Sequence, residues 1–94
     1  MPLYVMLSTL TDDGRKTIKN NPERIRQVSK EVEKMGAKVL NQYAVMGAYD
    51  FVTILEAANN EAISKVSVEL GSRGTMQIET HAAIPVFEFI EKMG

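Results

Sequence analysis

The order in which two hydrophobic periodicities alternate along the chain limits the fold more than any other feature of the sequence. Apolar residues at every second position predict β-strands, and apolar residues three and four positions apart predict α-helices. The two patterns follow one another as strand, helix, strand, strand, helix, strand. With two right-handed crossovers, this order predicts a ferredoxin-like α+β fold in which two helices cover one face of a four-stranded antiparallel sheet. We expect residues 1–94 to form one such domain.

Local signals define the first main helix. Asn21 is expected to be its N-cap and Pro22 its first residue, where the missing N–H of proline costs no hydrogen bond. Gly36 is expected to end the helix, because glycine is favoured just past a helix C-terminus. The apolar stripe of this helix consists of Ile25, Val28, Val32 and Met35.

The remaining elements follow from the same kinds of signal. The strand 3–10 is apolar on both faces, so it needs cover on both sides. Gly47-Ala48 is expected to form the turn of a hairpin. The other expected elements are strands at 38–46, 49–57 and 75–84, a second helix capped by Asn59 or Asn60 and closed by Gly71 and Gly74, a short helix over 86–93, and a loop at 11–21 with room for a helical turn at 15–18.

One face of the expected sheet has no helix to cover it. Successive side chains of a strand point to opposite faces, so each strand contributes alternate residues to this open face. A surface that is partly apolar and partly polar calls for a partner, and we expect a second copy to pack sheet to sheet, as a dimeric α+β barrel that could enclose a small molecule. The residues assigned to the open face are Tyr4, Met6 and Ser8, then Tyr49, Phe51, Thr53 and Leu55, and then Thr75, Gln77, Glu79, His81 and Ala83.

Composition excludes several classes of function. Eleven Lys and Arg against twelve Asp and Glu leave a net charge of −1, so nothing drives the chain toward nucleic acid or anionic lipid. The absence of Cys excludes disulfides and thiolate ligands, and a single His excludes a multi-histidine metal site within one chain. We therefore expect no metal, cofactor, nucleic acid or membrane partner. A strand that begins directly after Met1 and Pro2, with no signal peptide, predicts a cytoplasmic protein.

The hairpin carries a family resemblance. Gly47-Ala48-Tyr49-Asp50, followed by the strand FVTILEA, resembles the G-x-Y-D signature of the GYD family of small proteins. The resemblance covers nearly the whole chain and implies a stand-alone dimeric α+β barrel whose biochemical role is undefined. The further matching positions are Thr9–Gly14, Pro22–Arg24, Gly36, Gly74-Thr75 and Thr80.

A similar hairpin occurs in the effector-binding half of leucine-responsive bacterial and archaeal regulators. That half binds amino acids at interfaces between subunits, so the similarity implies a ligand-binding use of the fold. This chain lacks the helix-turn-helix that those regulators carry upstream, and its long segment after the first strand departs from them.

Six residues are candidates for ligand binding: Tyr49, Asp50, Thr53, Glu79, His81 and Arg24. Tyr49 could present its hydroxyl to a ligand or pack across a dimer seam. Glu79 and His81 share a strand face and could act as an acid–base pair or form a simple polar contact. Asp50 fits either a ligand role or the Asx hydrogen bonding of a hairpin, and Arg24 either an anion anchor near a helix N-terminus or a solvated surface position.

These features leave three classes of function open. The first is a homo-oligomeric binding or regulatory module that holds a small molecule in the barrel. The second is a cofactor-free oxygenase or isomerase that uses His81 and Glu79. The third is a structural or regulatory partner of another protein. No catalytic residue is assigned from the sequence.

Overall fold

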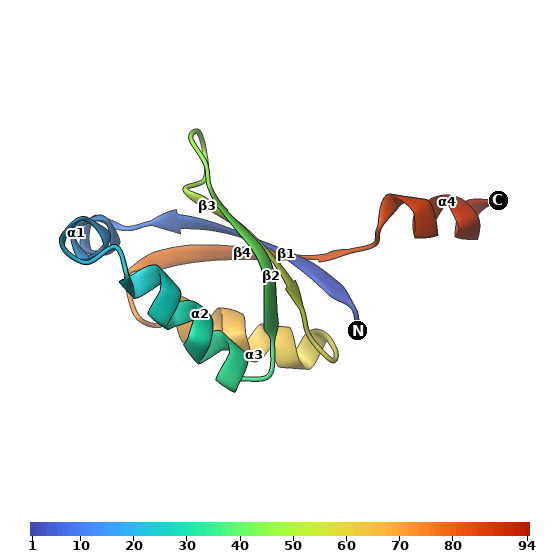
Figure 1. Ribbon diagram of the computed structural model, residues 1–94, viewed down its shortest axis with the longest axis horizontal. Helices are drawn as coiled ribbons and strands as arrows, with labels where there is room; N and C mark the ends of the chain where they lie inside the picture. Colours follow the sequence, from blue (N-terminus) through green and yellow to red (C-terminus); the bar gives the residue numbers. More distant parts are fainter.

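The computed structural model describes residues 1–94 and has the expected ferredoxin-like α+β architecture, with helices α2 and α3 on one face of a four-stranded antiparallel sheet (Figure 1). No helix combines the length and apolarity that a membrane span requires. The elements are β1 (Leu3–Leu10), α1 (Asp12–Asn20), α2 (Arg24–Lys34), β2 (Lys38–Ala44), β3 (Phe51–Glu56), α3 (Asn60–Gly71), β4 (Met76–Ala83) and α4 (Val86–Met93).

The strands lie in the order β2-β3-β1-β4, so β1 is central and pairs with both β3 and β4. Val5 marks the middle of the sheet, because it lies between Ile54 on one side and His81 on the other. The pairing of β2 with β3 is interrupted by an irregularity between Val39 and Asn41. This topology is the one that the order of the elements predicts, because both β-α-β connections pass over the same face.

The segment after β1, expected to be a loop, is instead the nine-residue helix α1. The Thr11 hydroxyl accepts a hydrogen bond from the Gly14 N–H at 3.2 Å, which caps the helix, and Asp12 and Asp13 in the first turn suit the positive end of the helix dipole. The Thr11 N–H donates to the Thr75 carbonyl at 3.0 Å and so attaches the helix to the start of β4. The expectation of a loop was wrong because it overlooked the local cap at Thr11 and the acidic first turn, and because the hydrogen bond to Thr75 comes from a residue far away in the sequence.

Helix α2 begins at Arg24, so the start expected at Asn21 and Pro22 was wrong by one short turn. The Asn21 carbonyl accepts from the Arg24 N–H at 3.0 Å, and Glu23 at the cap position makes no capping hydrogen bond with its side chain. The end of the helix agrees with the prediction, since Gly36 has a φ of 102°, a conformation that favours glycine.

Helix α3 follows its sequence signals closely. The Asn59 side chain accepts a hydrogen bond from the Ala62 N–H at 2.9 Å, as expected of an N-cap. Ile63, Val66 and Leu70 are buried against the sheet and form most of the contribution of α3 to the core. Local capping and a clear apolar stripe were sufficient to predict this helix.

The side of the sheet assigned to β1 and β3 was wrong. Tyr4, Met6 and Ser8 of β1 and Thr53 and Leu55 of β3 are buried beneath the helices. A one-residue shift reverses every side chain of a strand, and a strand that is apolar on both faces offers no pattern to choose between them. The assignment for β4 agrees with the structure at Gln77, Glu79 and His81, which are exposed on the open face while Met76 and Ile78 pack against the core. Two other residues assigned to the open face, Phe51 and Thr75, instead line the cavity on the helix side.

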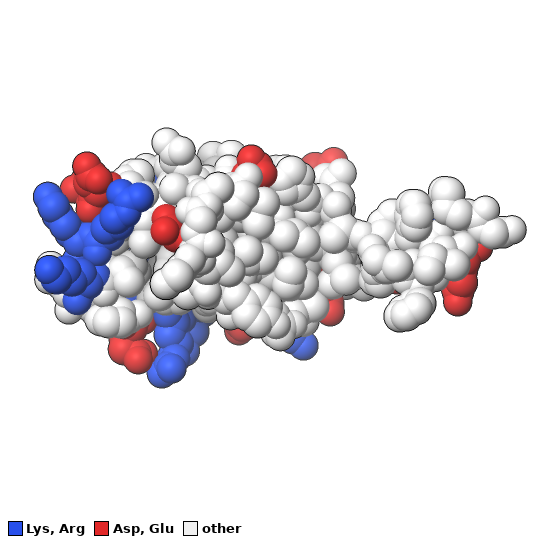
Figure 2. Space-filling model, turned by 90° about the horizontal axis from the view of Figure 1, so that it is seen from above, with Lys and Arg blue, Asp and Glu red and all other residues white.

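The opposite face of the sheet is left uncovered. Figure 2 shows this face with its charged groups gathered at the α1 end and along the margins, while uncharged atoms fill the centre. Leu3, Val5 and Leu7 of β1 and Val52 and Ile54 of β3 point to this side and are only partly buried. The single chain therefore presents an apolar surface without a partner.

Helix α4 projects beyond the end of the sheet and has no buried residue (Figures 1 and 2). Its aromatic and aliphatic side chains lie in solvent, and Phe87 reaches 82% exposure. The exposed apolar residues in and next to this helix are Ile84, Val86, Phe87, Phe89, Ile90 and Met93.

Candidate functional site

Three of the six candidate residues meet at the open face, at the end of the β2–β3 hairpin. Oε2 of Glu79 lies 2.8 Å from Nε2 of His81 and accepts a hydrogen bond from the Tyr49 hydroxyl at 3.1 Å. The predicted placement of Glu79 and His81 on one strand face is thus correct, and both side chains are about half exposed, at 53% and 56%. A carboxylate held between a phenol and an imidazole can exchange protons with a bound molecule.

The hydrogen bonds in this cluster change two pKa values. His81, and then Tyr49, hold the pKa of the Glu79 carboxyl below its usual range, because both stabilise the ionised form. Glu79 raises the pKa of the Tyr49 phenol above its usual value, because the phenol donates to the carboxylate and its ionised form would be repelled by it. The carboxylate stays charged and the phenol stays protonated over a wider pH range than either group would alone.

Asp50 supports the fold. Its Oδ2 accepts a hydrogen bond from the Leu10 N–H at 2.7 Å, and its own N–H donates to the Ser8 carbonyl at 2.8 Å. The Asp50 carbonyl accepts from the Val45 N–H at 2.8 Å across the hairpin loop, in which Gly47 has a φ of 131°. Asp50 therefore ties the hairpin to the end of β1.

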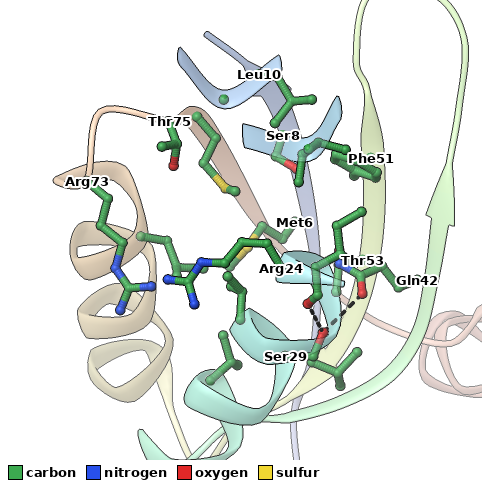
Figure 3. Close-up of a pocket in the computed structure, with 18 of the residues that line it drawn as sticks. Met6, Ser8, Leu10, Arg24, Ser29, Gln42, Phe51, Thr53, Arg73 and Thr75 are labelled. Atoms are coloured by element: carbon green, nitrogen blue, oxygen red, sulfur yellow. Dashed lines mark hydrogen bonds between the residues drawn. The ribbon is translucent and has the colours of Figure 1, made fainter. Parts of the chain in front are cut away.

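Thr53 and Arg24 lie on the other side of the sheet, beside a cavity of about 150 Å³ that α1, α2 and the end of α3 form with the sheet (Figure 3). Eleven of its twenty lining residues are hydrophobic. Its polar side is a chain of hydrogen bonds in which the Ser29 hydroxyl donates to Gln42 Oε1 at 3.1 Å and Gln42 Nε2 donates to Thr53 Oγ1 at 3.3 Å. The candidate residues therefore belong to two separate places, one on each face of the sheet.

Two arginines lie at the mouth of this cavity. Figure 3 shows the Arg24 side chain extending across toward Arg73. Glu31 joins them, with Oε2 3.0 Å from Nη1 of Arg24 and Oε1 3.0 Å from Nη2 of Arg73. Glu69 approaches the same Nη2 of Arg73 at 3.4 Å, whereas the buried Nη1 of Arg73 has no hydrogen-bond partner.

The side chains offer little for a metal ion. No group of three or more His, Cys, Asp or Glu side chains is arranged to hold one.

Comparison with known proteins identifies the family. The family model described as the GYD domain matches residues 4–93. The chain belongs to the GYD domain family. The Gly47-Ala48-Tyr49-Asp50 signature is thus part of a match over almost the whole chain, and the structure gives the motif a physical role in the attachment of the hairpin to β1.

This GYD domain also has a curated relative of nearly the same length. This relative is the "glutamine synthetase and cystathionine beta-lyase binding protein" of Thermus thermophilus, which is 45% identical to this chain over 94 residues, and the match covers 99% of each chain.

Two solved structures show the same fold in longer proteins. MtbAldR matches with a TM-score of 0.68 and 20% identity over 89% of this chain, and the leucine response regulatory protein of Mycobacterium tuberculosis matches with a TM-score of 0.56 and 13% identity over 92%. The chain spans about half the length of each, since the matches cover 52% of both. At these identities the similarity concerns the fold alone.

Sequence reasoning about this GYD domain missed the cavity and Arg73. Arg73 follows α3 in a Gly-Ser-Arg-Gly segment, about fifty positions away from Arg24, and no local pattern links the two. Arg24 was considered both as an anion anchor near a helix start and as a solvated surface position, and the structure places it as the first residue of α2, beside the cavity. No sequence signal could have found this pair, because it depends on the packing of the end of α3 beside the first turn of α2.

Proposed function

We propose that this GYD domain is a self-associating binding module that attaches to a metabolic enzyme. The observation that carries the proposal is the 45% identity, over 99% of both chains, to a relative named as a binding protein for glutamine synthetase and cystathionine beta-lyase. The surfaces of the chain support it, because an uncovered apolar sheet face and an exposed apolar helix are features of protein–protein interfaces.

A second copy is the occupant that suits the uncovered face. Pairing by a two-fold axis would set the apolar residues of β1 and β3 against the same residues of the partner. The charged groups of this face lie along its margins, Glu79 of the edge strand β4 among them, so the apolar residues of β1 and β3 can meet those of a second copy without like charges between them (Figure 2). Helix α4 leaves the sheet at its edge and could reach the partner in the same assembly, which would cover Phe89 and Ile90 as well.

Val5→Glu tests this self-association. Val5 lies at the middle of the uncovered face, between Ile54 and His81, and a carboxylate there remains solvated in a single chain but becomes buried and unpaired in the pair. Ser64→Glu is the matched control, because it adds the same charge on the exposed side of α3. Sedimentation should show the natural chain and Ser64→Glu as dimers, or as larger assemblies of dimers, and Val5→Glu with a dissociation constant at least tenfold higher, about 1.4 kcal/mol.

Enzyme binding is tested separately. Glutamine synthetase and cystathionine beta-lyase from the source organism of this chain are immobilised, and binding of the natural chain, Val5→Glu and Ser64→Glu is measured. We expect micromolar or tighter binding of at least one enzyme, and weaker binding by Val5→Glu because a single chain loses the avidity of two linked sites. If neither enzyme binds the natural chain at micromolar concentration, the proposed function is wrong. If the natural chain sediments as a folded monomer at micromolar concentration, the proposed self-association is wrong.

A further inference from the structure

The cavity beneath the helices is large for a core of this size. Protein interiors are close-packed and contain few voids larger than a water molecule. This one has a volume of about 150 Å³, and its lining includes Met6, Val32, Leu55 and Leu70, which are all buried residues of the core. An engineered cavity of about 150 Å³ lined by Leu, Ile and Phe binds benzene in another protein, and eleven of the twenty residues that line this cavity are hydrophobic. The space is therefore suited to an apolar group of about six carbon atoms.

The mouth of the cavity contains a donor with no acceptor. Nη1 of Arg73 is buried and makes no hydrogen bond, although Nη2 of the same guanidinium contacts both Glu31 and Glu69. A buried guanidinium N–H without a partner is costly, and natural structures rarely leave one unpaired. Nη1 itself is covered, but the Arg73 side chain as a whole is 25% exposed, so a turn of the guanidinium would bring Nη1 to an acceptor that arrives from solvent.

The chemistry of the mouth favours a carboxylate. A guanidinium presents planar N–H groups that match the two oxygens of a carboxylate, and such bonds are about twice as strong as neutral ones. Arg24 provides a second guanidinium across the cavity, and its Nη1 already contacts Glu31 at 3.0 Å. Glu31 thus spaces the two arginines, while Nη1 of Arg73 remains available to another acceptor.

The lining also argues against a zwitterion. No Asp or Glu lines the cavity itself, and the carboxylates of Glu31 and Glu69 at its mouth already contact Arg24 and Arg73 at 3.0–3.4 Å, so an ammonium group would have to compete with two guanidinium groups for them. The amide oxygen of Gln42 already accepts from Ser29. The ligand should accordingly carry one carboxylate and no amine.

We propose that this cavity binds a small monocarboxylate with an apolar tail of about six carbons, with the tail between α2 and the sheet and the carboxylate on Arg73, assisted by Arg24. The site belongs to a single chain and lies on the opposite face of the sheet from the proposed self-association surface. It is therefore independent of the proposed function.

Phenylacetate is the probe, because its ring matches the cavity and its carboxylate would extend to the arginines. Phenylacetamide has nearly the same shape without the charge, and phenylalanine adds an ammonium. Titrations of the natural chain, followed by calorimetry and by NMR signals of the lining residues, should show phenylacetate binding at least tenfold more tightly than either. No binding of phenylacetate, or equal binding of acid and amide, overturns the proposal.

Two substitutions locate the two ends of the ligand. Arg73→Gln should remove the preference for acid over amide, whereas Arg26→Gln, on the exposed side of α2, should leave it unchanged. Val28→Phe fills the cavity from α2 and should abolish binding, whereas Val68→Phe adds the same ring on the exposed face of α3 and should not. Phenylacetate binding that survives in a folded Val28→Phe chain places the ligand elsewhere. If Val28→Phe does not fold, the size of the site is tested instead with a larger acid, 1-naphthylacetate, on the natural chain. Binding of 1-naphthylacetate as tight as that of phenylacetate would contradict binding in a cavity of about 150 Å³.

Discussion

Replacement of Gly14 by alanine tests whether α1 is held as closely against β4 as the structure shows. A Cβ atom at Gly14 would lie 1.9 Å from the Thr75 carbonyl oxygen and 3.2 Å from Leu10 Cδ2, whereas ordinary contact begins at 3.4 Å. The obstacle is a backbone carbonyl, which cannot move aside as the end of a flexible side chain can. Helix α1 must therefore shift away from the start of β4.

The cost can be estimated from the contacts that this shift breaks. Thr11 donates twice across this junction, from its N–H to the Thr75 carbonyl at 3.0 Å and from its hydroxyl to the Gly74 carbonyl at 2.8 Å, and each bond contributes about 1 kcal/mol. Overpacking adds about 1–3 kcal/mol, and the better helix propensity of alanine returns about 1 kcal/mol. We expect Gly14→Ala to lower the free energy of unfolding by about 2–4 kcal/mol, which corresponds to a decrease in Tm of about 10–20 °C.

Gly71→Ala is the matched control. Gly71 is also a helical residue, at the end of α3, but a Cβ there would meet nothing within 4 Å. The same substitution should raise the free energy of unfolding by up to about 1 kcal/mol through helix propensity alone. Urea and thermal unfolding, followed by circular dichroism at one protein concentration, measure both variants. A Gly14→Ala protein as stable as Gly71→Ala would refute the close contact between α1 and β4.

Two further predictions concern the hairpin and the cluster beside it. Asp50→Ala should reduce the free energy of unfolding by about 1–2 kcal/mol, because the Leu10 N–H loses a charged acceptor, whereas Asp50→Asn should retain most of the stability. Equal stability of the natural chain and both variants in urea unfolding would contradict this role of Asp50. The pKa of Glu79, followed by carboxyl NMR, should rise in each of two single variants, and the rise should be larger in His81→Ala than in Tyr49→Phe. Because folding lowers the pKa of Glu79, the contribution of this carboxylate to stability is present above its pKa in the unfolded chain and is lost as the pH falls through its pKa in the folded chain. A pKa of Glu79 that is unchanged by His81→Ala would rule out the hydrogen bond between Glu79 and His81.

The sequence by itself determined the order of the elements and the fold class. Helix α3 illustrates why: its cap at Asn59 and its stripe of Ile63, Val66 and Leu70 all lie within one short window of the chain. The signature hairpin is similar, since the glycine turn and the strand that follows it are local features. Signals of this kind depend on neighbours a few positions apart, so they can be recognised without knowledge of what packs against the segment.

Tertiary structure alone decided which side of β1 and β3 is buried. Both strands carry apolar side chains on each of their two faces, so the sequence does not show which face is buried. Only the packing of α2 and α3 buries the face that contains Tyr4, Met6 and Leu55. The Tyr4 hydroxyl donates to Asn60 Oδ1 at 2.7 Å, a partner at the start of α3 that makes burial of this polar tip possible.

Helix α1 and the cavity were likewise decided in three dimensions. Helix α1 is held by the carbonyls of Gly74 and Thr75, and the cavity mouth joins Arg24 to Arg73, in each case residues that lie some fifty to sixty positions apart in the sequence. Capping and periodicity report only on neighbours within a few turns, whereas these sites exist because the sheet brings the end of α3 beside the starts of α1 and α2.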